Sequence, residues 1–323
     1  MKRIIAVLAA LLICIGIFAA CGNTHAKPGK TDDGNDAPSP SSAENLREII
    51  TSLKATEAEL GLENKYKTFD DVTDGKIDPA LIGTWKTADG SAVYTYGEDG
   101  ILKTKTDFYG TVSENELRYT CLGAQDKNII CLETEYSNYP EDGGEPETEL
   151  VITYSTYKIS GDVLYEMSVE EADPDSDNYN VSVQQFYKAD ENGSAEASIR
   201  SNPVNLESLY GTWKNDEDKS ITVGESGLVC DGETYAVSVN DKNDLVVEKD
   251  GVKTAYTFSL IYSKYFDGEG DEKHVSEEGY KLALNYTGKD ESDKPNLLAV
   301  MEDWHTLYEY ETWYYTANFD LAE

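Results

Sequence analysis

Leu81-Ile82-Gly83-Thr84-Trp85-Lys86 recurs along the chain as Leu209-Tyr210-Gly211-Thr212-Trp213-Lys214, with five of the six residues identical. Such a repeat within 323 residues indicates a duplicated domain. The length agrees, because it exceeds the roughly one to two hundred residues that a single domain usually has. We therefore expect one domain over residues 79–189 and a second over residues 206–323, joined by a polar linker over residues 190–205.

Short segments of alternating apolar and polar residues follow each copy of the repeat, for example Val163–Val169, Tyr235–Val239 and Tyr280–Tyr286. This period of two predicts half-buried strands. Tight hairpins need positive φ angles, which Asp-Gly pairs supply. Four such pairs are present: Asp89-Gly90, Asp99-Gly100, Asp231-Gly232 and Asp250-Gly251. The sequence predicts an all-β fold of two tandem antiparallel up-and-down β-barrels, since a meander of about seven to nine strands avoids exposed edges by closing on itself.

The tripeptides Gly83-Thr84-Trp85 and Gly211-Thr212-Trp213, each expected on a first strand, resemble the Gly-x-Trp signature of lipocalins and, more closely, the lipocalin-like repeats of bacterial lipoproteins. The resemblance covers both expected domains. It implies lipocalin-like barrels in which the tryptophan plugs the closed end and any ligand cavity lies at the open end. The plug residues that it implies are Gly83, Trp85, Gly211 and Trp213.

In lipocalins an arginine on the last strand packs over the tryptophan. After residue 20 the chain has three arginines, which are Arg47, Arg118 and Arg200. None of them falls on an expected last strand. The second half of the signature is therefore missing from both repeats.

Residues 1–20 have the charged, apolar and small-residue order of an export signal peptide, with Lys2-Arg3 before an apolar run that ends at Phe18. That run of about 15 residues, at about 1.5 Å each, is shorter than a hydrocarbon core of about 30 Å, so we expect cleavage and not a membrane span. Phe18-Ala19-Ala20-Cys21 resembles the bacterial lipobox, whose cysteine receives a diacylglycerol, although Leu is usual in place of Phe18. The resemblance implies lipidation at Cys21 and an extracytoplasmic protein anchored to the bacterial cell membrane. An ordinary signal peptide with an incidental cysteine is the alternative.

Residues 21–42 are rich in Gly, Pro, Ser and Asp, which is typical of a flexible tether. Residues 43–78 are expected to hold one amphipathic α-helix and a connector. Ser41 and Glu44 have the spacing of a capping box, and Gly61 offers a stop. Apolar residues recur at helical spacing between them: Leu46, Ile49, Ile50, Leu53 and Leu60. We expect this stripe to dock on the first barrel; a partner-binding or lid helix is the alternative.

The chain carries 62 Asp and Glu against 27 Lys and Arg, a formal net charge of −35. This field repels polyanions, which excludes a nucleic-acid binder that depends on neutralising phosphates. Direct attachment to anionic membrane surfaces is disfavoured for the same reason. The 39% of hydrophobic residues, together with 23 tyrosines, still suffices for packed cores.

Cys121 and Cys131 flank an expected hairpin loop, where two directly opposed cysteines in an oxidising compartment can form a cross-strand disulfide. Reduced core thiols are the alternative, and Cys230 has no evident partner. The cysteines show no zinc-type spacing, and His274 and His305 stand apart without further ligands. Because the sequence shows neither a nucleophilic triad nor a Gly-rich phosphate loop, we expect no cofactor and no enzymatic activity.

Alternating acidic residues mark two candidate calcium loops, because carboxylates of this spacing can converge on a hard cation. The first candidate comprises Asp173, Asp175 and Asp177. The second comprises Asp267, Glu269 and Asp271, with Glu278 at the twelfth place. Both loops lack the central glycine of an EF-hand, and solvated loops in an acidic protein are the alternative.

Aromatic residues crowd the C-terminal part of the chain: Trp304, Tyr308, Tyr310, Trp313, Tyr314 and Tyr315. Flat rings serve barrel cores and also stack on ligands, including sugars. Tyr308 and Tyr310 share one strand face, so with Trp304 they are the candidate ligand-binding residues. Packing in the core or between the domains is the alternative.

Taken together, these patterns predict a lipid-anchored extracytoplasmic binding protein that captures a small, partly apolar ligand in one barrel. The alternative is an interaction or scaffold protein with solid barrels that binds a protein or glycan of the envelope. An extracellular hydrolase is a third hypothesis, which needs a cleft with a carboxyl group of raised pKa. The presence and position of a cavity distinguish the first two hypotheses.

Overall fold

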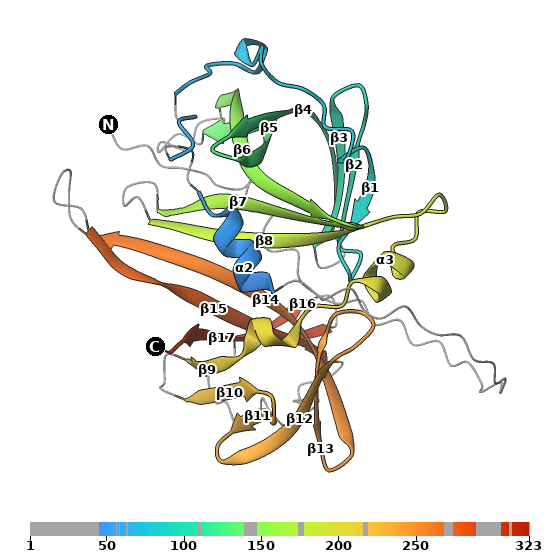
Figure 1. The fold of residues 1–323 in the computed structure, drawn as a ribbon, viewed down its shortest axis with the longest axis vertical. Helices are drawn as coiled ribbons and strands as arrows, with labels where there is room; N and C mark the ends of the chain where they lie inside the picture. Colours follow the sequence, from blue (N-terminus) through green and yellow to red (C-terminus); the bar gives the residue numbers. More distant parts are fainter. Residues whose placement is uncertain are drawn as a thin grey trace.

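The computed structural model of the chain is an all-β structure with two closed barrels of eight antiparallel strands each (Figure 1). The predicted tandem barrels, preceded by one helix, are confirmed. The structure describes residues 45–55, 57, 59–62, 64–108, 111–138, 147–173, 178–215, 219–267, 274–288, 305–309 and 312–322.

Barrel 1 begins at the first copy of the repeat and runs as a meander, in which each strand pairs with the next. Its strands are β1 (Gly83–Lys86), β2 (Ala92–Tyr96), β3 (Ile101–Phe108), β4 (Thr111–Ala124), β5 (Lys127–Asn138), β6 (Glu147–Ser160), β7 (Val163–Asp173) and β8 (Asn178–Lys188). The barrel closes where β1 pairs with β8, with Trp85 opposite Lys188.

Barrel 2 begins at the second copy and repeats this plan. Its strands are β9 (Gly211–Lys214), β10 (Ser220–Gly224), β11 (Gly227–Cys230), β12 (Glu233–Val239), β13 (Leu245–Lys249), β14 (Val252–Asp267), β15 (His274–Gly288) and β17 (Thr312–Leu321). The barrel closes where β17 pairs with β9, with Leu321 opposite Trp213. The short strand β16 (His305–Glu309) pairs with the first half of β17.

Two of the four Asp-Gly pairs form the two-residue hairpin turns expected of them. The φ angles are 49° and 76° at Asp231 and Gly232, and 52° and 81° at Asp250 and Gly251. Both central residues of a type I′ turn require a positive φ. The other two pairs lie in longer loops, in which only the glycine has a positive φ.

The tryptophans of the two repeats are built into the barrels in the same way. Trp85 and Trp213 are fully buried, and each indole Nε1 donates a 2.7 Å hydrogen bond to the carbonyl four residues earlier, on Leu81 and Leu209. The glycine of each Gly-Thr-Trp has a positive φ, 127° in the first copy and 140° in the second, which a residue with a side chain rarely adopts. The repeated spacing thus produces the same local geometry in both barrels.

A cation covers each tryptophan ring, although it comes from a different element in each barrel. The Lys188 Nζ on β8 lies 5.2 Å from the ring centre of Trp85. The guanidinium carbon of Arg47 lies 5.2 Å from the ring centre of Trp213, and Arg47 also donates to the Tyr210 carbonyl at 2.5 Å. Cations over aromatic faces are attracted by the ring quadrupole. The arginine missing from the last strand is therefore supplied from the preceding helix in barrel 2, and a lysine takes its place in barrel 1.

That helix is α2 (Leu46–Leu53), which is shorter than the sequence predicts. Its N-cap is Asn45, whose side chain accepts from the Arg47 amide at 3.0 Å, whereas the expected cap pair Ser41 and Glu44 lies outside the described residues. The helix ends at Lys54, so Leu60 does not belong to the stripe. Leu60 packs instead, in the connector, against the outer face of β5.

Helix α2 lies between the barrels and does not dock on the first barrel alone. The Leu46 amide donates to Ser208 Oγ in the 3-10 helix η2 (Leu206–Leu209) at 2.8 Å, which ties the helix to barrel 2. At its other end the Thr156 hydroxyl of β6 donates to the Leu53 carbonyl at 2.9 Å, which ties it to barrel 1. The buried face of α2 belongs to one apolar cluster with residues of both barrels, such as Met167 and Leu260.

The two barrels also share backbone pairing. Residues 179–182 of β8 pair with residues 261–264 of β14, so one hydrogen-bonded network joins all seventeen strands. In Figure 1, β8 lies above β14, and the two strands run beside each other where they pair.

The expected disulfide between Cys121 and Cys131 is wrong in this structure, where both are free thiols. The β4–β5 turn is centred on Gln125 and Asp126, which sets Cys121 opposite Ile130. Because side chains alternate across a strand, a shift of one residue places Cys131 on the other face of the sheet. Cys131 accordingly packs in the cluster under the connector, and Cys121 faces the barrel 1 core.

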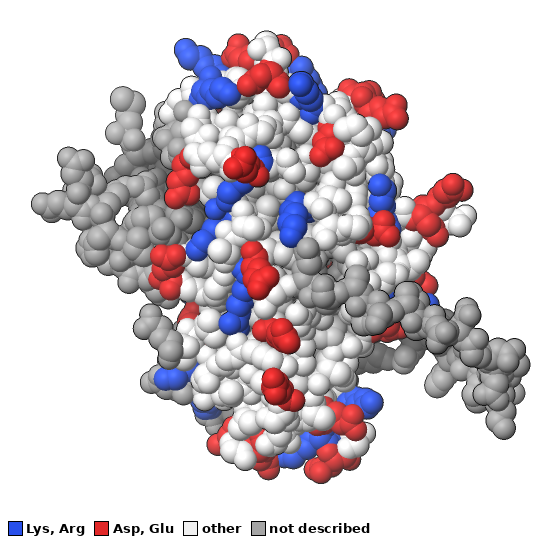
Figure 2. Space-filling view, viewed as in Figure 1, with Lys and Arg blue, Asp and Glu red and all other residues white. Residues whose placement is uncertain are grey.

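Surface charges of both signs are interspersed over the face of the two barrels drawn in Figure 2. Some form cross-strand pairs, such as Lys103 with Glu116 at 2.8 Å and Lys105 with Glu114 at 2.9 Å. Across the described ranges, no helix combines the length and the apolar composition needed to cross a membrane.

Replacing Arg47 with Ala is expected to lower the free energy of unfolding by about 2–4 kcal/mol, because it removes a half-buried cation over Trp213 and its hydrogen bond to the Tyr210 carbonyl. Urea unfolding followed by circular dichroism measures this loss. The matched control is Arg200→Ala, an exposed arginine whose loss is expected to change stability by less than about 0.5 kcal/mol. Equal effects of the two substitutions would contradict the role given to Arg47.

Candidate functional site

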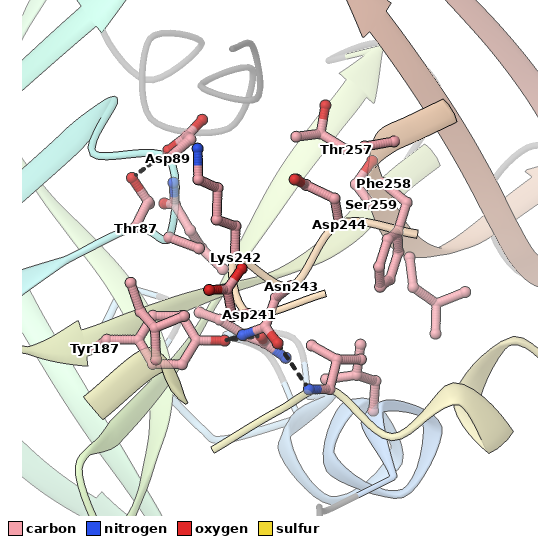
Figure 3. Close-up of a pocket in the computed structure, with 18 of the residues that line it drawn as sticks. Thr87, Asp89, Tyr187, Asp241, Lys242, Asn243, Asp244, Thr257, Phe258 and Ser259 are labelled. Atoms are coloured by element: carbon pink, nitrogen blue, oxygen red, sulfur yellow. Dashed lines mark hydrogen bonds between the residues drawn. The ribbon is translucent and has the colours of Figure 1, made fainter. Parts of the chain in front are cut away.

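A cavity of about 760 Å³ lies between the two barrels (Figure 3). Barrel 1 contributes the outer face of β8 and the loop between β1 and β2, and barrel 2 contributes β14 and the loop 240–244. Helix α2, the linker helix α3 (Glu196–Ser201) and strand β15 also contribute to the lining. Its volume falls in the range of about 300–1,000 Å³ that is usual for small-molecule sites.

The cavity exists because β8 and β14 separate. On one edge β14 pairs with β13 as far as Tyr256 and with β8 only from Ile261 onward. The same edge of β8 pairs with β14 as far as Ser182 and with β1 from Tyr187 onward. Residues 183–186 and 257–260 are thus the two arms of a fork, which we call the β8–β14 fork. Most of its residues line the cavity: Val183, Gln184, Gln185, Thr257, Phe258, Ser259 and Leu260.

The loop 240–244 forms the polar wall and is held by its own side chains. Asn240 Oδ1 accepts from the amides of Lys242 and Asp244 at 2.8 and 2.9 Å. Asn243, with a φ of 65°, donates through its amide to the Tyr187 hydroxyl and accepts from the Val204 amide at 3.0 Å. These bonds fix the loop of barrel 2 against strand β8 of barrel 1. Figure 3 shows the loop facing residues 257–259 of β14 across the cavity.

The opposite side of the cavity is apolar. Its lining includes aliphatic and aromatic side chains from α2, β8, α3 and β14: Leu46, Ile50, Val183, Ile199, Phe258 and Leu260. The cavity therefore offers an apolar surface on one side and hydrogen-bonding groups on the other, which is the usual make-up of a ligand site.

Asp244 is the most deeply placed carboxyl group of the polar wall. Burial raises the pKa of Asp244, while a hydrogen bond from the Asn240 amide at 2.9 Å and the charge of Lys242 oppose the rise. Negative charge on Asp89 and Asp241 adds to it. In Figure 3 the side chain of Lys242 points toward Asp89, which accepts from the Thr87 hydroxyl at 2.7 Å. A positively charged group in the cavity would offset this local excess of carboxylates.

The interior of barrel 1, by contrast, is filled by aromatic side chains. The ring centres of Tyr94 and Phe186 lie 4.5 Å apart, and those of Tyr96 and Tyr119 lie 5.1 Å apart. Glu166 is buried among them and accepts from Ser155 Oγ at 2.7 Å and from the Tyr96 hydroxyl at 3.2 Å. Burial raises the pKa of Glu166 above its ordinary value of 4.5.

The candidate ligand residues are largely outside the described part of the chain, so their placement relative to this cavity stays a prediction. Tyr308 is described only by its place on β16, opposite Trp313, and Trp304 and Tyr310 lie outside the described residues. Cys21 also lies outside them.

The candidate calcium loops are only partly described. Asp173 is the last residue of β7 and pairs with Asn178, whereas Asp175 and Asp177 lie outside the described residues. The second loop is likewise undescribed between Asp267, at the end of β14, and His274, at the start of β15. In the parts of the chain that the structure describes, no group of three His, Cys, Asp or Glu side chains is placed to hold a metal ion.

The lining residues missed by the sequence analysis had only a weak signal. Asn240-Asp241-Lys242-Asn243-Asp244 is a run of turn-forming residues between two strands, which predicts a loop. Its contact with Tyr187 joins residues 56 positions apart, and nothing local indicates such a contact.

The described lining contains no His or Cys, so within it no thiolate or imidazole is available as a soft metal ligand. Asp244 is a carboxyl group of raised pKa in a cleft, as a hydrolase requires, but the wall around it is equipped for hydrogen bonding and apolar contact. The arrangement favours binding. No protein-family model, curated protein or solved structure matches the chain.

Replacing Glu166 with Gln is expected to stabilise the protein above pH 4.5, and more so as the pH rises. The folded-state pKa is raised, so the contribution of Glu166 to stability is complete below 4.5 and is lost as the pH rises through the folded-state value. The unfolding free energy of the unsubstituted protein should fall relative to the variant by up to about 1.4 kcal/mol per pH unit. Urea unfolding between pH 4 and 8 measures this, with the exposed Glu149→Gln as the control that leaves the pH profile unchanged.

Proposed function

We propose that this protein is a lipid-anchored, extracytoplasmic binding protein that holds a small, partly apolar ligand in the cavity between its barrels. The observation that carries the proposal is the cavity itself, with its apolar wall, its fixed polar loop and its ligand-sized volume of about 760 Å³. Because the walls come from both barrels and from α2, the duplicated fold is needed to build the site. The sequence analysis proposed that the ligand is captured inside one barrel; we now propose that it is held between the two barrels.

The proposed location rests on the N-terminal sequence. Phe18-Ala19-Ala20-Cys21 supports lipidation at Cys21 after cleavage of residues 1–20. The diacylglycerol would hold the protein at the membrane, since two acyl chains anchor stably. A flexible tether of about twenty residues, with an r.m.s. reach of roughly 25 Å, would lift the barrels clear of the lipid headgroups.

The scaffold hypothesis keeps one specific support, which is the filled interior of barrel 1. A solid barrel 1 agrees with a structural role for that domain, and its outer wall at β8 still forms half of the proposed ligand site. The two hypotheses differ in whether the cavity retains a small molecule.

Replacing Cys21 with Ala is expected to release the protein from the membrane fraction. Loss of the thiol removes the attachment point of the diacylglycerol, so radiolabelled palmitate should no longer be incorporated. Fractionation of cells that express either form measures the change, with Cys230→Ala as the control, because Cys230 is buried in barrel 2. Palmitate incorporation by the Cys21→Ala form would contradict the proposed anchor.

Replacing Ser259 with Trp is expected to fill the cavity and abolish ligand retention. Ser259 is half-buried on β14 and lines the cavity, whereas Thr234 is exposed on β12 and does not, so Thr234→Trp is the matched control. Native mass spectrometry of the chain from residue 22 onward, mixed with a small-molecule extract of the cell envelope, should show an adduct for the unsubstituted protein and the control only. An adduct that survives Ser259→Trp would place the ligand elsewhere, and no adduct on any form would favour the scaffold hypothesis.

A further inference from the structure

We propose that the β8–β14 fork binds a short, extended, positively charged peptide, which pairs as an additional strand with residues 257–260 of β14. This inference rests on the proposed function, since it names the class of ligand that the same cavity takes. It is carried by the register of the strands, the acidic wall and the dimensions of the cavity.

The open strand edge is the first observation. Every residue of a paired antiparallel strand directs its amide and carbonyl to one neighbour or the other, in alternation. The β14 edge is paired with β13 up to Tyr256 and with β8 from Ile261, so in the described part of the chain no strand pairs with residues 257–260 on that side. Two of these four residues therefore direct both backbone groups into the cavity. An extended peptide is the ligand whose own backbone matches such a row of alternating donors and acceptors.

The dimensions agree with three or four ligand residues. Four residues of β-strand span about 13 Å, at about 3.3 Å each. All of residues 257–261 line the cavity, and its volume of about 760 Å³ leaves room for side chains on both sides of the added strand. The apolar wall, which includes Phe258 and Leu260, would contact alternate side chains of the peptide.

The charge of the peptide is inferred from the wall beside the open edge. Asp244 directly precedes β13, whose first residue, Leu245, pairs with Tyr256 of β14. Figure 3 shows Asp244 facing Thr257, the first residue of the open strand edge. Within the described residues its side chain accepts a hydrogen bond from Asn240 and joins no ion pair, while Lys242 points toward Asp89. Lys242 is one cation beside three carboxylates, Asp89, Asp241 and Asp244, so a peptide amine or lysine placed at this end of the edge would pair with the negative charge that remains. The formal net charge of −35 would also raise the local concentration of a cationic ligand.

The test uses the chain from residue 22 onward, which keeps every described residue, and a library of tetrapeptide amides with one Lys at each position in turn and Ala, Val, Leu, Thr or Tyr elsewhere. Native mass spectrometry is expected to detect retained members, and calorimetry then gives the affinity of the tightest one. N-methylation of its backbone, one residue at a time, should weaken binding about tenfold or more at alternate residues only, because every second residue pairs with β14. A ligand that merely fills the cavity would show no such alternation.

Two substitutions of equal charge test the role of the acidic wall. Asp244→Asn is expected to weaken binding of the peptide about tenfold, and Asp231→Asn, in the exposed β11–β12 turn, to leave it unchanged. An equal loss in both would reduce the role of Asp244 to general charge and overturn its assignment.

The outcomes separate this inference from the proposed function. If the library gives no retained member, or if N-methylation has the same effect at every residue, strand addition at the fork is overturned. If a non-peptide molecule is then retained and is displaced by Ser259→Trp, the proposed function stands without the peptide. If nothing is retained from either source, both fail.

Discussion

Four residue pairs between β8 and β14 join the barrels, and the rest of the arrangement depends on them. A strand has two edges, so β14 can continue its pairing with β8 only after it has left β13. The change of partner opens the fork, and α2 fills the remaining space between the barrels with an apolar face. The cavity, the position of the helix and the contact between the barrels thus share one cause.

The two copies of the repeat show which parts of the duplicated plan are fixed by physics and which have changed. The indole hydrogen bond and the positive φ of the glycine are the same in both barrels. The threonine of each repeat also makes the same hydroxyl–hydroxyl hydrogen bond to the next strand, Thr84 with Thr95 at 3.0 Å and Thr212 with Thr222 at 2.9 Å. A cation lies over the indole in each barrel, but it is Lys188 from the last strand in barrel 1 and Arg47 from α2 in barrel 2. A cation can reach a ring face from any element that passes over it, so this requirement is met by different positions in the sequence.

The sequence was sufficient for features that depend on near neighbours. Alternation predicted the strands, the Asp-Gly pairs predicted tight hairpins, of which those at Asp231-Gly232 and Asp250-Gly251 are confirmed, and the repeated hexapeptide predicted two barrels. Predictions from the sequence were wrong where the structure depends on a single turn residue or on a contact between residues far apart in the chain. The turn centred on Gln125 and Asp126 places Cys121 and Cys131 on opposite faces of the sheet. Both turn residues have a positive φ, but neither is a glycine, so the sequence does not indicate where the turn lies.

The bounds and docking position of the helix, and the cavity, could not be predicted from the sequence for a different reason. Asn45 and Glu48 have the same cap spacing four residues after the expected pair Ser41 and Glu44, but only the contacts with both barrels determine that α2 ends at Lys54. Arg47 meets Trp213, and Asn243 meets Tyr187, across separations that no periodicity reports. The fork arises from strand register, which amino-acid composition does not report. The candidate ligand residues Trp304, Tyr308 and Tyr310 were chosen by aromatic content, and they stay a prediction because their side chains lie outside the described residues.

The fork is also the place where the fold leaves backbone polar groups in need of a partner. A buried amide or carbonyl without a hydrogen bond costs about 1–3 kcal/mol, so closing the fork without a partner for its backbone groups would be unfavourable. Packing α2 more deeply would not help, because the backbone of a helix is satisfied within the helix and has little to offer a strand edge. Solvent, or a ligand with backbone groups of its own, can supply the missing hydrogen bonds. Because β14 leaves β13 before it pairs with β8, joining the two barrels in this way produces a cavity with an open strand edge.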